Sequence, residues 1–227
     1  QRECNRCHRY NISLNLLLCC MKYTWPKFKL CRREQKNLFW PAKYDVKKNR
    51  ALPGQNGTGG MPRYSEYGKL LRNKQSLKRS YLLSERQFAT IVKEKSQRYA
   101  KNNNVSHDNA LFQFLETRLD TVVLRSGLAN SIMQARQMVN HGHLTLNGVK
   151  HNIPSTFVQV GDVVAVREKL QSSPLYGQAW GNPNATPSSW IKVDKNKFAI
   201  ELISQPKMGE MESGSDFLKV IEFYARA

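Results

Sequence analysis

The stretch RLDTVVLRSGLANSIMQARQMVNHGHLTLNG, residues 118–148, decides the fold of the region around it. Apolar residues at helical spacing predict a first helix over about 109–126, which Gly127 ends. A capping box that opens at Ser131 predicts a second helix over about 132–140. The stretch closes on Asn-Gly, the strongest short hairpin signal. Helix, helix and hairpin in this order favour a small α+β unit.

Residues that follow this stretch extend the unit with short strands and loops. The pattern VQVGDVVAVREK (158–169) predicts two strands around a Gly-Asp turn, and residues 190–203 predict two more. Residues 171–190 are rich in Pro, Gly and Ser and predict a loop. The last segment, 217–227, alternates only partly and fits a strand or a helix.

Residues that precede the stretch predict a helical, basic region. Residues 22–62 are rich in Lys, Arg, Pro and Gly, and little regular structure is expected there. Ser65 can cap a helix that runs to about Tyr81, and a capping box at Ser84 opens a second helix. A polar linker over 101–109 marks the expected boundary between the two regions.

The positive charge is concentrated in this first region. The chain of 227 residues has a formal net charge of +19. Residues 22–101 hold 21 Lys or Arg and five acids, which gives +16, while residues 1–20 give +2 and residues 102–227 give +1. Such an excess favours a polyanionic partner, nucleic acid first and an anionic membrane surface second. No apolar run approaches the ~18 residues of a spanning helix, so no membrane insertion is expected.

The motifs of common enzymes are absent from the sequence. It contains no P-loop, no G-x-G-x-x-G after a strand, no H-E-x-x-H and no G-x-S-x-G. Glu116 and Asp120, four apart on the expected helix, could act as paired carboxylates, but Arg118 and Arg125 are in reach of them. Ion pairing is therefore their expected role. We expect no catalytic residue, no cofactor and no small-molecule substrate.

All five cysteines lie in the first 31 residues: Cys4, Cys7, Cys19, Cys20 and Cys31. Their odd number argues against a disulfide framework and favours a reducing compartment. Cys4-x2-Cys7 with His8 resembles one half of a zinc site, but the sequence offers no second close pair of ligands to complete it. No metal is expected, and residues 1–21 are expected to form an extension outside the functional fold.

Two groups of side chains suit contact with RNA. Arg binds phosphate bidentately and stacks on bases, and a helix start offers free N–H groups to an anion. No acid lies in sequence between Glu66 and Glu85, so the cations between them favour a phosphate-facing surface over a merely solvated helix face. The two groups are Lys69, Arg72, Lys74, Lys78 and Arg79 in the first helix, and Arg118, Arg125, Gln134, Arg136, Gln137, His141, His143 and Asn147 around the quoted stretch.

The quoted stretch closely resembles the RNA-binding module named after small-subunit ribosomal protein S-four. Other segments resemble the same bacterial-type ribosomal family: WPKFKLCRREQ (25–35), LPGQNG (52–57), SEYGKLLRNKQSLKRSYLLSERQF (65–88) and VIEFYAR (220–226). The chain is therefore identified from its sequence as a member of that family. Two departures stand out: only Cys31 remains of the four-Cys zinc knuckle that some members carry over about 28–52, and Asn56 replaces a frequent His.

The resemblance implies an architecture in two lobes. The fold class is α+β, a helical basic lobe plus a small α+β module in which two helices pack on a short-stranded sheet. The helical lobe would span 22–107, with 214–227 packing back on it, and the second lobe would span 108–213, with the module at about 116–178.

The resemblance also implies a function and a set of site residues. The family implies a structural constituent of the small ribosomal subunit that binds its RNA as a primary binder, nucleates assembly of the subunit body and contributes to translational accuracy. Small-subunit ribosomal RNA and the neighbouring proteins S-five and S-twelve would be its partners. The family's RNA-facing positions fall on Arg118, Ser131, Gln134, Arg136, Gln137, His141, Gly142, His143 and Asn147, and Arg32, Arg33 and Arg63 extend the basic surface.

Three alternatives stay open at this point. A stress-type ribosome rescue factor carries the same module, but it would lack the basic lobe and the VIEFYAR ending. An RNA-modifying enzyme fragment also carries it, but the residues after the module are too few for a catalytic domain. A cytoplasmic, ribosome-bound location is expected, and an organellar ribosome is the alternative.

Overall fold

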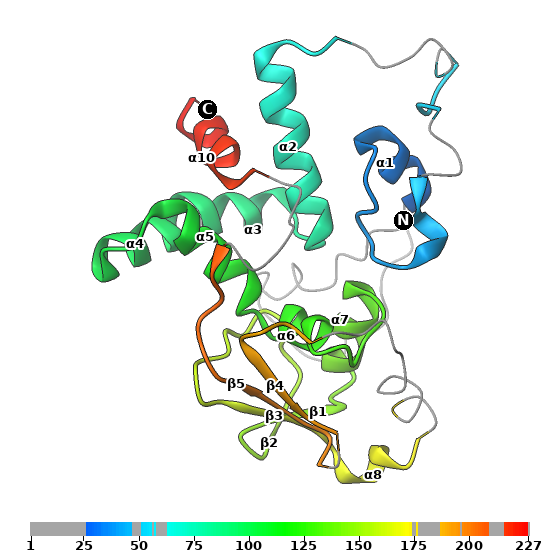
Figure 1. Cartoon of the computed structure of the whole chain (residues 1–227), viewed down its shortest axis with the longest axis vertical. Helices are drawn as coiled ribbons and strands as arrows, with labels where there is room; N and C mark the ends of the chain where they lie inside the picture. Colours follow the sequence, from blue (N-terminus) through cyan, green and yellow to red (C-terminus); the bar gives the residue numbers. More distant parts are fainter. Residues whose placement is uncertain are drawn as a thin grey trace, which may run out of the picture.

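The computed structural model describes residues 26–46, 51–55, 57, 63–173, 176, 187–195, 197–208 and 216–226. The expected extension over 1–21, four of the five cysteines and Asn56 lie outside these residues. Figure 1 shows a helical lobe above and a smaller lobe with a β-sheet below, so the predicted α+β class is confirmed. No described helix is long and apolar enough to span a membrane.

The helical lobe is built on the two predicted helix starts. Ser65 Oγ accepts a hydrogen bond from the Gly68 amide at 3.2 Å, and Ser84 and Gln87 form the complete capping box. The helices of this lobe are α1 (Lys27–Glu34), the 3₁₀ turn η2 (Ala42–Tyr44), α2 (Glu66–Ser80), α3 (Glu85–Thr90), the π-helical segment η4 (Ile91–Ser96), α4 (Gln97–Asn103), α5 (His107–Glu116) and α10 (Phe217–Arg226).

Helix α1 corrects the expectation of little regular structure over 22–62. Pro26 precedes its first residue, a position that suits proline because the first amides of a helix have no internal partner. Leu30 and Cys31 are buried with Leu38 and Phe39 in a small core of their own. The apolar residues are too few to dominate the basic composition, which is why composition alone missed the helix.

The last segment is a helix that packs on α2, and Figure 1 shows the two side by side at the top of the molecule. Phe217 and Val220 of α10 share a core with Leu77 of α2 and Phe88 of α3. The chain end therefore closes the core of a lobe whose other helices lie more than 100 residues earlier.

The lower lobe packs α6 (Leu119–Arg125) and α7 (Ile132–Asn140) on an antiparallel sheet. The strand order is β2-β1-β3-β5-β4. Two of the three predicted strand pairs form: β1 pairs with β2 through Asn147-Gly148, and β4 pairs with β5. The bounds are β1 (Leu144–Leu146), β2 (Val149–His151), β3 (Val163–Val166), β4 (Ile191–Asp194) and β5 (Ala199–Leu202), and the short helix α8 (Glu168–Gln171) follows β3.

The helix expected over 109–126 and the first strand expected within 158–169 need the same correction. The helix expected over 109–126 is broken into α5 and α6, because Arg118 is extended and forms an isolated antiparallel bridge with Phe157. The amide of Val158 donates to the Thr117 carbonyl at 2.8 Å. The first strand expected within 158–169 is therefore absent from the sheet, since the chain just before it is used to pair with the helix break.

Helix α5 belongs to the core of the helical lobe. Leu111, Phe112 and Leu115 pack with Phe88 and Phe217, whereas Leu119 of α6 belongs to the core of the lower lobe. The sequence predicts the lobe boundary between residues 107 and 108. The change of core falls at the helix break, later in the chain than this expected boundary.

Candidate nucleic-acid interface

The five cations of α2 are paired with carboxylates of the same protein, which corrects the premise that no acid faces them. Glu34, at the end of α1, lies 2.6 Å from Arg79 and 3.3 Å from Arg72. The carboxylate is almost completely buried, so desolvation raises its pKa against the opposing pull of the two guanidinium groups. Arg72 and Arg79 thus join α2 to α1.

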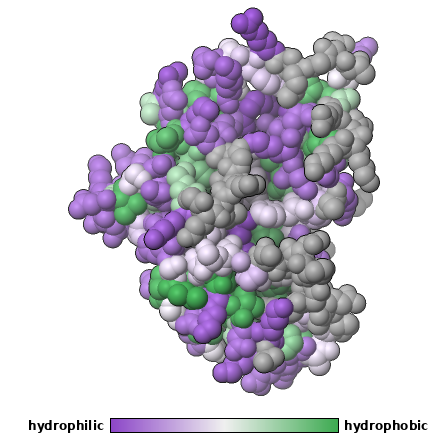
Figure 2. All heavy atoms as spheres, viewed as in Figure 1, coloured by the Kyte–Doolittle hydropathy of each residue, from purple (hydrophilic) through white to green (hydrophobic). Residues whose placement is uncertain are grey.

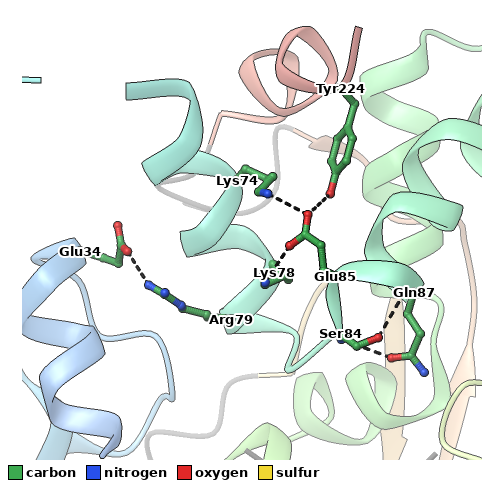
Figure 3. Close-up of polar contacts among 8 residues, drawn as sticks. All are labelled: Glu34, Lys74, Lys78, Arg79, Ser84, Glu85, Gln87 and Tyr224. Atoms are coloured by element: carbon green, nitrogen blue, oxygen red, sulfur yellow. Dashed lines mark hydrogen bonds and ion pairs between the residues drawn. The ribbon is translucent and has the colours of Figure 1, made fainter. Parts of the chain in front are cut away.

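Glu85 organises the other side of α2, as Figure 3 shows. Its carboxylate accepts hydrogen bonds from Lys74 at 2.7 Å, from Lys78 at 2.8 Å and from the Tyr224 hydroxyl at 2.8 Å. Burial opposes its ionisation, but these hydrogen bonds outweigh burial and lower the pKa of Glu85 to about 2. Three helices, α2, α3 and α10, therefore meet at this one carboxylate.

Lys74 is a cation on the buried face of α2. Its side chain is buried, and its ammonium lies 4.6 Å from the ring centroid of Phe223 as well as against Glu85. Lys69 makes the weakest pair, an exposed contact of 2.8 Å with Glu66 one turn earlier. Of the five cations, Lys69 is the one most free to exchange its carboxylate for a phosphate.

Asp120 binds two arginines of the lower lobe, and one of them also contacts the upper lobe. It is fully buried and accepts two hydrogen bonds from Arg118, at 3.1 and 3.0 Å, and two more from Arg136, at 3.0 and 2.7 Å. Arg136 also donates to the carbonyl oxygens of Leu82, at 2.8 Å, and Tyr81, at 2.9 Å, in the turn between α2 and α3. Its guanidinium therefore bridges the two lobes.

Arg125 is held by Glu116 in the same way. Two hydrogen bonds of 2.8 Å join its guanidinium to the carboxylate, confirming the ion pair expected from the sequence, although the two residues stand on different helices. The hydroxyl of Tyr81 donates to the same carboxylate, and burial, followed by the charge of Glu116, raises the pKa of Tyr81 well above its ordinary value. On its other side Arg125 lies 4.5 Å from the ring centroid of Trp40.

The outer face of α7 is a polar surface that the lower lobe presents to solvent. Gln137 and His141 are exposed there with Asn140 and, at the helix start, Asn130. Ser131 caps the helix through the Gln134 amide, and the Gln134 side chain accepts from the Asn130 amide, so both are partly used within the fold.

The turn residues of the module also have structural duties. Asn147 donates to Asp162 and accepts from the Val163 amide, at 2.8 and 2.9 Å, which links the β1–β2 turn to β3. Gly142 has a φ of +66° and follows the end of α7. His143 lies 2.7 Å from the Tyr176 hydroxyl, and desolvation, then the nearby charges, lowers its pKa.

Sequence spacing missed most of the cations of the helical lobe that are exposed and form no ion pair among the described residues. The only available signal was the total charge of the region, because these residues follow no motif. Arg33 and Arg63 were predicted and are exposed, whereas Arg32 donates to the carbonyls of Ala51 and Leu52. The exposed cations for which the described residues supply no ion pair are Lys29, Arg33, Lys43, Arg63, Arg86, Lys93, Lys95, Arg98 and Lys101.

These cations lie on the part of the molecule that Figure 2 shows as mainly hydrophilic, the helical lobe, whereas hydrophobic side chains gather on the lower lobe in that view.

Among the residues described, no group of three His, Cys, Asp or Glu side chains could hold a metal ion. Cys31 is a buried thiol whose pKa is raised by desolvation. The Cys4, Cys7 and His8 cluster lies outside the described residues, so its zinc question stays as the sequence left it.

The two lobes match two known protein families. The family described as ribosomal protein S4/S9 N-terminal domain matches residues 22–116, and the S4 domain family matches residues 117–164. The change from one to the other falls at the helix break. The fold and the matches thus define a class of protein, in which a ribosomal helical domain precedes an S4 domain.

Comparison with whole proteins narrows this class. Small ribosomal subunit protein uS4 of Heliobacterium modesticaldum is 38% identical over 212 residues, covering 90% of this chain and 99% of the relative. The uS4 proteins of Lacticaseibacillus casei and Burkholderia cenocepacia are 37% and 38% identical, covering 89% and 90% of this chain and 97% and 99% of theirs. The chain belongs to the bacterial-type family of small ribosomal subunit protein uS4, which confirms the resemblance drawn from its sequence.

Proposed function

We propose that the protein is a structural constituent of the small ribosomal subunit and binds the RNA of that subunit. Its relatives are named small ribosomal subunit proteins, and the match runs through both lobes rather than through the S4 domain alone. The rescue-factor and enzyme-fragment alternatives share the S4 domain only, so this coverage does not favour them. Nucleation of subunit assembly, a contribution to translational accuracy and contacts with S-five and S-twelve belong to the same proposal.

The exposed cations without a carboxylate partner are the observation that carries RNA binding. Arg86, Lys93, Arg98 and Lys101 follow one another along α3, η4 and α4, and none of them forms an ion pair with a carboxylate of the described residues. Phosphate oxygens can replace water around such groups at little cost, whereas a paired cation must first lose its carboxylate. We therefore assign phosphate binding mainly to these residues and to Lys29, Arg33, Lys43, Arg63 and Lys95.

The lower lobe supplies positioned polar contacts in this proposal. Gln137 and His141 are exposed on α7, and His141 lies edge-on to His143 with ring centroids 5.8 Å apart. Side chains of these types hydrogen-bond to RNA edges or stack on splayed bases. Arg118, Arg125 and Arg136, which the sequence placed at the RNA, are assigned instead to holding this surface in position, with Ser131, Gly142 and Asn147.

Competition between RNAs tests the proposal directly. Labelled small-subunit ribosomal RNA is bound to the full chain and challenged with unlabelled small-subunit or large-subunit RNA at equal mass and salt. We expect the small-subunit RNA to compete at much lower concentration. Replacement of Gln137 and His141 by Ala should narrow this difference. Equal competition by the two RNAs would contradict the proposal, because charge alone would then explain binding.

We propose a ribosome-bound location, with the cytoplasm as the expected compartment and an organellar ribosome as the alternative. A catalytic activity, a cofactor and a small-molecule substrate are not part of the proposal.

A further inference from the structure

Trp40 stands at the surface in a constrained turn between α1 and η2. Its side chain is 48% exposed, although the preceding residue, Phe39, is fully buried. Its backbone φ of +73° lies in the left-handed region that bulky side chains rarely adopt. The side-chain amide of Asn37 donates to the carbonyls of Trp40 and Pro41, at 3.3 and 3.1 Å, and so holds this turn. The indole is therefore presented outward by a fixed backbone.

One face of the indole is covered by a guanidinium that cannot move freely. Arg125 Cζ lies 4.5 Å from the Trp40 ring centroid, well within the range of a cation–π contact. Glu116 holds that guanidinium through two hydrogen bonds of 2.8 Å and is itself fully buried. The contact joins the α1–η2 segment to α5 and α6. It holds the indole ring in place, while the hydrogen bonds of Asn37 hold the backbone.

A fixed, half-exposed indole in a basic lobe is suited to an unpaired RNA base. Each base has a π face, so stacking on an aromatic ring adds affinity with little regard to sequence. The exposed cations Arg33 and Lys43 lie within seven residues of Trp40 along the chain and can meet the flanking phosphates. Trp40 and Tyr67 are the large exposed aromatic side chains among the described residues, and only Trp40 has a guanidinium on its ring.

We infer that Trp40 is a stacking platform for an unpaired nucleotide of the RNA, with Arg125 and Glu116 as its positioning residues. The inference rests on the proposed function, because it needs an RNA partner. It gives Arg125 an indirect role: its side chain is only 9% exposed, so it acts through the indole instead of touching RNA. The alternative is that Trp40 merely shields the Arg125–Glu116 ion pair from water.

Three variants of the full chain separate these roles. Trp40→Leu removes the π face and keeps an apolar side chain without adding a β-branch at positive φ, and Trp40→Phe keeps a smaller ring. Leu218→Ala is the matched control, since Leu218 is an exposed apolar residue of α10 that cannot stack. Affinity for small-subunit ribosomal RNA is measured over a range of salt, together with the thermal unfolding midpoint of each variant.

We expect Trp40→Leu to weaken RNA binding by about 5- to 150-fold, the loss of one base stack. The slope of log affinity against log salt should not change, because no phosphate contact is lost. Trp40→Phe should lose less, and Leu218→Ala should bind like the parent protein. If Trp40→Leu binds RNA with the parent affinity, whether or not its unfolding midpoint falls, the platform is overturned and only a shielding role remains.

Single abasic nucleotides identify the stacked base. They are introduced in turn into the smallest small-subunit RNA fragment that the full chain binds. We expect one position at which the abasic site weakens binding of the parent protein but not of Trp40→Leu. Equal losses for both proteins at every position would overturn the platform. If the parent protein does not prefer small-subunit RNA at all, the proposed function fails instead, so the two failures are distinct.

Discussion

Asp120 receives two guanidinium groups in a site from which water is excluded. Removing a charge from water is costly, and the cost is recovered only when hydrogen bonds satisfy each group. Both carboxylate oxygens of Asp120 are used by Arg118, and Arg136 adds two further contacts to one of them. The loss of either arginine would leave part of a buried charge unsatisfied, so each has a structural duty independent of RNA.

Arg136→Ala should therefore destabilise the fold. The sequence alone predicts an RNA contact whose loss leaves the unfolding midpoint almost unchanged, and the geometry reverses that expectation. Because Arg118 still satisfies Asp120, we expect a loss of about 2–3 kcal/mol, below the ~3–5 kcal/mol of a fully broken buried pair. Denaturant unfolding measures it. Gln137→Ala is the control, because Gln137 is the next residue and is exposed, and it should leave the free energy of unfolding unchanged. If Arg136→Ala also leaves it unchanged, Arg136 is an RNA contact and not a structural residue.

Glu85 should make stability depend on pH in the acid range. Its folded pKa of about 2 lies below the ordinary 4.5, so the native state binds its proton less readily than the unfolded state. The stabilisation is present above about pH 4.5 and is lost as the pH falls toward 2. Glu85→Gln should make this acid-induced loss shallower and cost only about 1 kcal/mol at pH 7, since the carboxylate is nearly half exposed.

Glu94→Gln is the matched control for this measurement, because Glu94 is exposed on η4 and forms no ion pair among the described residues. Thermal unfolding of the parent and both variants is followed from pH 7 to pH 2. If the Glu85→Gln and Glu94→Gln curves fall in parallel with the parent curve, the hydrogen bonds from Lys74, Lys78 and Tyr224 do not lower the pKa as the structure indicates.

Among individual residues, the sequence could predict only the partners that lie close along the chain. The pairing of Arg118 with Asp120 was within reach, because two positions separate them. Glu34 is 38 positions from Arg72 and 45 from Arg79, and no helical spacing relates such residues. The contact between Trp40 and Arg125 likewise joins residues that are far apart in the sequence. The cations of α2 therefore looked free in sequence and are paired in space.

At the scale of elements, the β1–β2 hairpin depends on a turn that only small residues form without strain. Asn147 and Gly148 both have positive φ, at 51° and 84°. A Cβ at Gly148 would meet open space, so Gly148→Ala adds backbone strain and no clash. We expect a loss of about 1–2 kcal/mol, the cost of a left-handed conformation for a residue with a side chain, read from denaturant unfolding.

Gly68→Ala provides the control of opposite sign. Gly68 lies in the first turn of α2, where a Cβ would make ordinary contacts with Ser65 and Tyr64. Alanine favours a helix over glycine, so this variant should gain up to about 1 kcal/mol. Equal destabilisation by both Gly→Ala changes would mean that the side chain, and not the turn geometry, is responsible.

Local signals predicted most elements, and the exceptions share a physical cause. Caps and turn residues placed the starts of α2, α3 and α7 and both hairpins, since these signals act within four residues. The break between α5 and α6 was not predictable, because the leucine spacing continues across it. It exists because Arg118 pairs with Phe157, 39 residues later, and that pairing also removes the strand expected near 158.

At the scale of the whole molecule, the two lobes divide two physical tasks. The helical lobe carries most of the charge excess, and part of that charge is consumed in joining α1, α2, α3 and α10. The lower lobe is nearly neutral and presents a polar helix face at a fixed angle, because Arg136 ties it to the turn between α2 and α3. Affinity and selectivity are thus expected to respond to different residues.

The salt dependence of the affinity for RNA should distinguish the unpaired cations from the paired ones. If about ten phosphates are neutralised, log affinity should fall against log salt with a slope of about −7 to −9. Arg86→Gln with Arg98→Gln removes two exposed, unpaired cations, and the slope should become less negative by about 1.4–1.8 at an unchanged unfolding midpoint.

The matched double variant removes two cations that hold carboxylates. Lys74→Gln with Lys78→Gln makes the same change in net charge, but Glu85 loses both of its lysine partners. We expect the slope to change by less than about 1 and the midpoint to fall, because these lysines stabilise the fold rather than neutralise phosphate. An equal change of slope for the two double variants would show that Glu85 releases its lysines to RNA. A slope near −2 for the parent protein would instead reject a broad phosphate interface.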